Sequence, residues 1–177
     1  MLLDDWQIGC CGTPPAVGDT ASWRLVWAPW CASVIPSTMA LRARLEQLPP
    51  DTDDRYPRAN AGEDTVPAIA KAHGIDVFVQ APLPLQEDLT LTGVLHEDHH
   101  VGVPPGFPRT TGRITAVWLM SWKYRRGNGR WHSVEGTARF TSVEQAPKHL
   151  RMEPPPDHAE FWWFNNSVLA NLEITPD

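Results

Sequence analysis

The chain has 177 residues, of which 20% are charged, and its formal net charge is −6. This length suits one domain with a sizeable core, and the negative charge disfavours a general affinity for nucleic acid or anionic membranes. No run approaches the roughly 18 apolar residues that span a bilayer, so we expect no membrane partner. The opening letters M-L-L-D-D-W-Q lack the basic and apolar regions of a secretory signal, and three cysteines do not make a disulfide framework. We therefore expect a cytoplasmic protein with reduced thiols.

The chain is unusually rich in proline and tryptophan, with 18 and 9 residues respectively. Proline, at about twice its ordinary frequency, favours short strands and rigid turns because it removes a backbone donor and breaks helices. Residues 4–19 accordingly predict an extended segment that is interrupted by glycines and a Pro-Pro pair. Residues 21–27 then alternate Trp or Leu with other side chains, which predicts a half-buried strand.

The middle of the chain carries the helical signals. Residues Ser37–Leu48 predict a helix, because a Ser or Thr can cap it, three leucines share one face and a Pro-Pro pair stops it. A shorter helix is predicted from Thr65 to His73, and a strand follows through Ile75–Val79. Residues 28–74 are therefore expected to form a helical and loop excursion from a β framework.

The third quarter of the chain gives the clearest strand pattern. Residues 113–125 alternate apolar with mostly polar side chains, and the letters R-G-N-G at 126–129 are typical of a tight turn. The chain returns through residues 131–143, so we expect a long β-hairpin.

The C-terminal residues continue this pattern. Residues 160–164 predict a short strand, which Asn165-Asn166 turns into a closing strand over 168–174. Many strands joined by Pro and Gly turns predict a mainly β fold, a small bent sheet or barrel of the SH3-like or OB-like kind with a short helical insertion. We expect a single domain over residues 1–177.

A block of ionisable residues, H-E-D-H-H at 96–100, matches the zinc-protease motif H-E-x-x-H. That chemistry needs a helix, because the two histidines must face the metal together. Here the preceding residues 89–95 alternate like a strand, and Gly and Pro follow, so we interpret the match as coincidental. Imidazoles on a strand and loop can still approach one zinc ion together with thiolates. The candidate metal ligands are Cys10, Cys11, His96, His99 and His100. In the alternative interpretation the thiols are buried small side chains and the histidines lie in a solvated loop.

Aromatic and basic side chains are interleaved over residues 118–132. Such a pattern can stack on bases and neutralise phosphates. The alternation equally predicts that the aromatic face is core and that the cations cluster at a solvated hairpin tip, where charge discourages edge pairing. A second run, F-W-W-F at 161–164, cannot point all four rings to one side of a strand. The candidate binding residues are Trp122, Lys123, Arg125, Arg126, Arg130, Trp162 and Trp163.

Two motifs together carry a family resemblance. The opening D-W-Q-I-G-C-C-G-T-P with V-G-D, and the H-E-D-H-H block with the T-T-G-R-I strand, resemble a family of small uncharacterised bacterial proteins. These share a D-W-x-x-x-C-C-G-x-P opening and a His/Glu-rich block, and the resemblance covers about the first thirty residues and about residues 91–115. Because the family is a domain of unknown function, it implies no activity, only that the Cys-Cys and His blocks occur together.

From these patterns we expect a cytoplasmic binding or interaction module for a protein partner or a small ligand, with zinc from the Cys and His blocks as the one candidate cofactor. Two alternatives stay open. One is a metal-assisted hydrolase that uses the His96–His100 cluster, with Glu97 or Asp98 as the base. The other is a nucleic-acid-binding β-barrel that uses the 118–132 hairpin, which the net charge disfavours. Whether the protein is an enzyme is left open, and a binding module is favoured.

Overall fold

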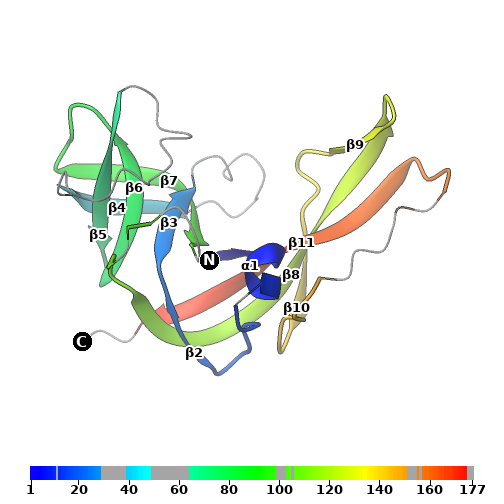
Figure 1. Ribbon diagram of the computed structural model, residues 1–177, viewed down its shortest axis with the longest axis horizontal. Coiled ribbons are helices and arrows are strands. Elements are labelled where there is room, and N and C mark those ends of the chain that lie inside the picture. Colours follow the sequence, from blue (N-terminus) through cyan, green and yellow to red (C-terminus); the bar gives the residue numbers. More distant parts are fainter. Residues whose placement is uncertain are drawn as a thin grey trace. The chain divides into compact units, whose positions relative to one another are not determined.

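The computed structural model describes residues 1–10, 12–28, 39–48, 64–98, 103–104, 106–150, 155 and 157–174. These residues form a mainly β protein with one short helix (Figure 1). The chain divides into two compact units. Of the described residues, the first unit holds those within 1–21 and 113–173, and the second holds those within 22–112 and Ile174.

The second unit is built around a closed five-stranded β-barrel. The strands pair in the order β3-β6-β5-β4-β7, and β7 pairs again with β3 to close the ring. Only β3 and β6 run parallel, and the other pairs are antiparallel. The strands are β3 (Leu25–Ala28), β4 (Met39–Gln47), β5 (Thr65–Ala72), β6 (Ile75–Pro82) and β7 (Asp88–Glu97). The prediction of a mainly β fold with a small barrel is therefore confirmed.

Small side chains fill much of the barrel wall. Alternate residues of β4 and β5 are buried, and they include Ala43, Ala68 and Ala70. A ring of only five strands encloses little space, so alanine suits positions where a larger barrel would place Leu or Ile. The tight turn between β5 and β6 uses His73 and Gly74, both with positive φ (48° and 78°), as a two-residue hairpin turn requires.

Both helices predicted in the middle of the chain are wrong. Residues 39–47 and 65–72 are the strands β4 and β5. The letters L-R-A-R-L-E at 41–46 alternate apolar with charged side chains, but the helix was predicted from three leucines that share one helical face. Pairing on both sides of β4 then outweighs the helical propensity of Leu, Arg and Glu. Residues 29–38 and 49–63 of the predicted excursion lie outside the described residues, and the single domain stays a prediction.

The first unit is a sheet organised around the long strand β8. Strands β9 and β10 pair with one edge of β8, β11 pairs with the other, and β1 pairs with β11. The strand β2 (Thr20–Trp23) also pairs with β8. The remaining elements are β1 (Leu2–Asp4), α1 (Asp5–Cys10), β8 (Thr110–Gly127), β9 (Arg130–Ser133), β10 (Arg139–Val143) and β11 (Phe161–Ile174).

The predicted hairpin over residues 113–143 is confirmed. Its turn is Asn128-Gly129, with φ of 51° and 74°, and the chain returns as β9 and β10. The side chains predicted to be core on β8 include Ile114, Met120 and Trp122, and all three are buried.

Two other predictions in this unit are wrong. Asn165-Asn166 does not turn the chain, because β11 runs unbroken from Phe161 to Ile174 beside the still longer β8. The opening segment is not extended throughout, because residues 5–10 form α1. The backbone N–H of Asp4 donates to Gln7 Oε1 at 2.9 Å, which is the capping-box arrangement that starts a helix. No helix among the described residues is long and apolar enough to cross a membrane.

Candidate binding site at the β8–β9 hairpin

The H-E-D-H-H block begins on a strand. His96 and Glu97 are the last two residues of β7, and they pair with Val26 and Leu25 of β3. Glu97 is buried, with 4% of its surface exposed, whereas His96 and Asp98 are half-buried. The zinc-protease motif needs a helix that carries both of its histidines, and here His96 and Glu97 belong to a strand.

The candidate metal ligands are divided between the two units. Cys10 ends α1 in the first unit and is exposed, whereas His96 belongs to the second unit. Cys11, His99 and His100 lie outside the described residues. Within the described residues, no group of three or more His, Cys, Asp or Glu side chains is placed to hold a metal ion. The zinc site stays a prediction of the sequence.

The predicted binding residues of the hairpin fall into two groups. Trp122 is core, with 5% of its surface exposed, and no partner for its indole Nε1 is found among the described residues. Lys123 is half-buried, as are both tryptophans of β11. The three arginines at the hairpin end are all exposed, and they are Arg125, Arg126 and Arg130.

One cluster of four aromatic rings joins β8, β9 and β11. Trp162 stacks on Phe164, with 5.0 Å between centroids and 27° between planes. Tyr124 lies 6.0 Å from Trp162 and 6.1 Å from Phe164, and Trp131 lies 5.9 Å from Trp162. Partial burial among these rings raises the pKa of the Tyr124 phenol above its ordinary value. The rings therefore pack mainly against one another and stabilise the hairpin end.

The other two aromatic residues of the F-W-W-F run are covered by cations. Lys123 Nζ lies 3.8 Å from the ring centroid of Phe161, and Arg139 Cζ lies 3.5 Å from that of Trp163. Each such contact is worth about 0.5–2 kcal/mol, depending on its exposure to water. The expectation that four consecutive rings divide between the two sides of a strand is thus met: one pair joins the ring cluster and the other lies beneath cations.

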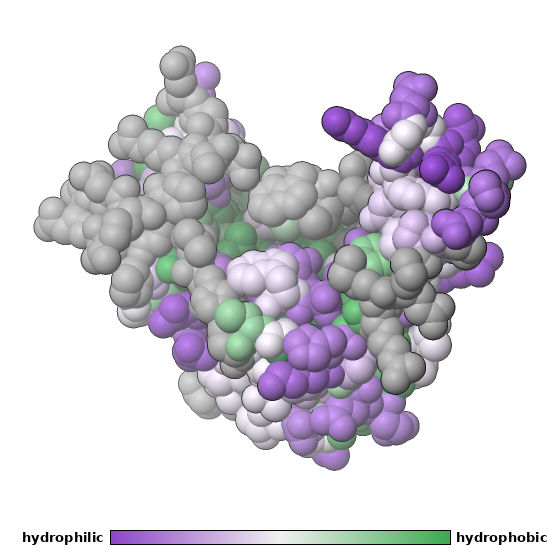
Figure 2. All heavy atoms as spheres, turned by 45° about the vertical axis from the view of Figure 1, so that its right-hand side comes forward, coloured by the Kyte–Doolittle hydropathy of each residue, from purple (hydrophilic) through white to green (hydrophobic). Residues whose placement is uncertain are grey.

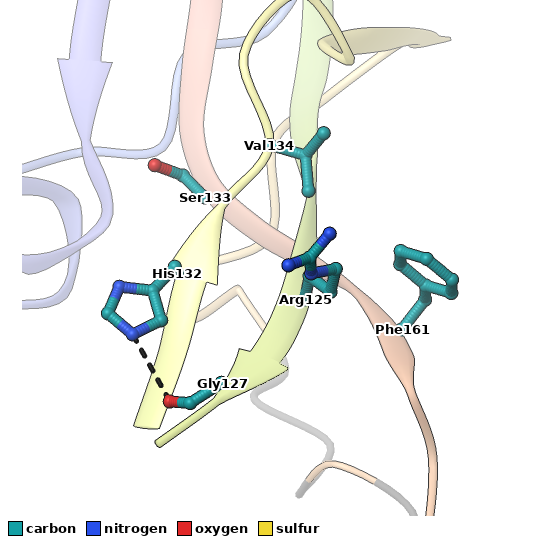
Figure 3. Close-up of a pocket in the computed structure, with 6 residues that line it drawn as sticks. All are labelled: Arg125, Gly127, His132, Ser133, Val134 and Phe161. Carbon is teal, nitrogen blue, oxygen red and sulfur yellow. Dashed lines mark hydrogen bonds between the residues drawn. The ribbon is translucent and has the colours of Figure 1, made fainter. Parts of the chain in front are cut away.

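A pocket opens beside Phe161 at the end of the hairpin (Figure 3). Its volume is about 380 Å³, and it lies between β8, β9 with the residue after it, and the first residue of β11. Phe161 remains 40% exposed there in spite of the lysine over its ring. The lining residues are Arg125, Gly127, His132, Ser133, Val134 and Phe161.

Hydrogen bonds hold two walls of the pocket in place. A ring nitrogen of His132 lies 3.2 Å from the carbonyl oxygen of Gly127, across the hairpin turn (Figure 3). The Thr137 hydroxyl donates to the carbonyl of Val134 and accepts from the backbone N–H of Lys123 at 3.2 Å. The N–H of Val134 donates to the carbonyl of Lys123 at 2.8 Å. The loop after β9 is therefore fastened to β8.

Positive charge is concentrated around this pocket. The segment Ser121–Arg139 holds five of the chain's 15 Lys and Arg residues and only one carboxylate, in a chain of net charge −6. In the part of the chain that the structure describes, no ion pair involves Arg125, Arg126 or Arg130. Figure 2 shows hydrophilic side chains gathered over this hairpin end, at the upper right.

Sequence reasoning missed part of this site. Val134 lines the pocket and Arg139 covers Trp163, but neither was predicted, and the lining residues Phe161 and His132 were noted only as members of longer aromatic and basic runs. A strand places alternate side chains on one face. The odd-numbered residues of the F-W-W-F run, and those of residues 123–125, could therefore have been assigned to one face of each strand from the sequence. Arg139 gave no such signal, since it comes from β10, beyond the end of the hairpin turn.

A closed five-stranded barrel and a long hairpin with a basic, aromatic end make up this mainly β protein. The chain belongs to a family of unknown function, DUF6578, whose family model matches residues 1–171. This confirms the resemblance to a family of unknown function seen in the sequence. No curated protein and no solved structure matches the chain. What the hairpin binds has to be argued from its own side chains.

Proposed function

We propose that the protein is a binding module and that the hairpin end around the Phe161 pocket binds a negatively charged partner. One observation carries this proposal: the Arg125 guanidinium lines a pocket beside an exposed aromatic ring and is without an ion-pair partner among the described residues. Arginine presents planar, paired donors that match carboxylate and phosphate oxygens, and such charge-assisted bonds are among the stronger hydrogen bonds in proteins.

The chemistry of the lining favours binding over catalysis. Among the six lining residues there is no carboxylate, thiol or lysine, and the one imidazole, His132, is engaged with the Gly127 carbonyl. General acid–base catalysis needs a group that is placed to exchange protons with a substrate. A cation beside an apolar ring instead suits a ligand with an anionic group and an apolar part, and a volume of about 380 Å³ lies within the ordinary range for ligand sites.

The pocket is also ordered before any ligand arrives. The Thr137 hydrogen bonds fix one wall, the His132 contact fixes another, and Lys123 lies on the Phe161 ring. Binding to a preformed site loses less side-chain entropy than binding to a mobile one, so a modest number of contacts gives a useful affinity.

Charge reversal at the pocket tests this proposal. We expect Arg125→Glu to weaken binding of a fluorescein-labelled acidic peptide of alternating Glu and Val by about 10- to 100-fold, because a hydrogen bond to a charged group contributes about 1.5–3 kcal/mol. Arg42→Glu is the matched control, since Arg42 is exposed on β4 in the other unit and undergoes the same change of charge. Fluorescence anisotropy at low salt measures both variants. Equal weakening by the two variants, or no binding of either this peptide or a labelled fifteen-residue oligothymidine, would overturn the proposal.

A further inference from the structure

We infer that the partner is an acidic polypeptide segment, which adds as an extended strand to the second edge of β11 at Phe161–Asn166. This inference rests on the proposed function and names the class of partner. It follows from three observations on the first unit: an edge that the described strands leave without a pairing partner, a charge that selects the partner, and aromatic rings that are already in contact with other side chains.

The edge arises because β1 is much shorter than β11. β1 pairs with Ser167, Val168 and Leu169 only, and the backbone of Met1 extends the contact to Ala170. β8 lies along the opposite edge of β11, which continues past the end of β1 (Figure 1). Among the described strands, none pairs with the second edge of residues 161–166. Unpaired N–H and C=O groups along such an edge form a template for another strand.

The charge at this edge selects against a second copy of the same chain. Two copies that paired through residues 161–166 would bring together two sets of the cations Lys123 and Arg139, which lie over Phe161 and Trp163 of that strand. Lys and Arg near an edge are a common device that prevents such self-pairing. The same cations attract a strand that carries Asp or Glu. The charge therefore disfavours pairing with a second copy of this chain and favours an acidic partner.

The aromatic rings favour a polypeptide over single-stranded nucleic acid. Binding to bases uses several open ring faces in succession. Here Trp162 and Phe164 stack on each other and contact Tyr124, while Lys123 and Arg139 lie over the faces of Phe161 and Trp163. Phe161 is the one ring of this set that is exposed. The aromatic rings of this set are therefore already in contact with one another or with cations.

The pocket supplies the specificity that an added strand needs. It opens beside Phe161, the first residue of the free edge, and Arg125 and Val134 line it. Alternate side chains of a strand point to one face, so a strand that passes Phe161 can direct one side chain into the pocket while its neighbours point away. Main-chain hydrogen bonds to β11 then supply affinity, and the pocket supplies specificity for the side chain that enters it.

Two N-methylated peptides test this inference. The probe is a labelled ten-residue peptide of alternating Glu and Val, together with one version that is N-methylated at every Glu and another at every Val. A strand that adds to β11 directs one set of its N–H groups to β11 and the other set to solvent. We therefore expect one methylated version to bind at least tenfold more weakly than the other. The unmodified peptide should protect the amides of Phe161–Asn166 from hydrogen exchange.

The outcomes separate this inference from the proposed function. Equal effects of the two methylation patterns, or unchanged amide exchange at residues 161–166, would overturn strand addition and leave an ionic site that depends on Arg125. An oligothymidine that binds more tightly than the peptide, and that also depends on Arg125, would overturn the choice of polypeptide alone. Loss of Arg125 dependence for both probes would overturn the proposed function itself.

Discussion

Gly93 on β7 is in close contact with the indole of Trp27, and this contact makes a sharp stability prediction. A Cβ atom at Gly93 would lie 2.9 Å from Trp27 Nε1 and 3.1 Å from Trp27 Cε2. It would also lie 3.1 Å from the carbonyl oxygen of Ala28, which belongs to the backbone and cannot rotate away as a side chain could. Trp27 is only 5% exposed, so its ring has little room to retreat. Gly93→Ala should therefore strain the barrel wall.

The magnitude is the balance of two opposing effects. Overpacking of a well-packed core costs about 1–3 kcal/mol. Replacement of glycine by alanine in a strand recovers roughly 0.5–1 kcal/mol, because the unfolded chain loses conformational freedom. We expect a net loss in the free energy of unfolding of about 0.5–2 kcal/mol, which in a protein of this size lowers Tm by roughly 1–8 °C.

Urea and thermal denaturation followed by circular dichroism measure this loss. Gly127→Ala is the control, because a Cβ at that strand position meets only His132, at 3.6 Å, and should be neutral or stabilising. In a Trp27→Phe background the smaller ring leaves space, so Gly93→Ala should cost less there than in the parent chain. Full stability of Gly93→Ala would show that neither close contact limits packing at this position, and an equal cost in both backgrounds would show that the indole of Trp27 does not.

Two further predictions concern the first unit. Burial lowers the pKa of the Met1 amino group from 8.0 to about 6, while the amine donates to the Ala170 carbonyl at 2.7 Å. Between pH 6 and pH 8 the unfolded chain then binds more protons than the folded chain, so for a free Met1 amine the free energy of unfolding should rise with pH by about 2 kcal/mol. Urea denaturation at both pH values should lose this component after N-terminal acetylation, and an unchanged pH dependence would contradict it. Thr137→Val removes the hydroxyl that links Lys123 to Val134 and should cost about 0.5–1.5 kcal/mol, with faster exchange of the Lys123 amide. Thr137→Ser should retain both properties, and identical exchange in the two variants would count against this role of the hydroxyl.

The elements that were predicted correctly from the sequence are those in which a single spacing of apolar side chains dominates. The hairpin over 113–143 was found because its alternation is long and Asn128-Gly129 is a strong turn signal. The strand β4 was missed because its buried leucines, Leu41 and Leu45, are four residues apart, a spacing that fits one face of a helix as well as one face of a strand. The helix α1 was missed because its start signal, Asp4 followed by Gln7 three residues later, lay in a segment that was interpreted from its glycines.

The candidate site was likewise predicted only in part. Its residue types are visible in short segments of the sequence, whereas the contacts between separate strands are not. Lys123, Arg125 and the two tryptophans of β11 could be proposed from composition alone. Their contacts with one another could not be predicted, because the ring–ring and cation–ring contacts depend on which strands lie side by side. Arg139 reaches Trp163 only because β10 and β11 flank β8, and that arrangement is a property of the sheet and not of any short segment.

The closed barrel also sets the order in which this part of the chain can fold. Its ring is complete only when β7 pairs with β3 and with β4, which brings Leu25 beside Glu97. A ribosome delivers β3 long before β7, so the edge of β3 that pairs with β7 has no neighbour during most of the synthesis of this unit. Contacts between distant residues are made late and slowly, because the entropy of a long loop is lost before they form. The hairpin of β5 and β6, with its two-residue turn, can form early. The barrel closes only after β7 has been synthesised and pairs with β3 and β4.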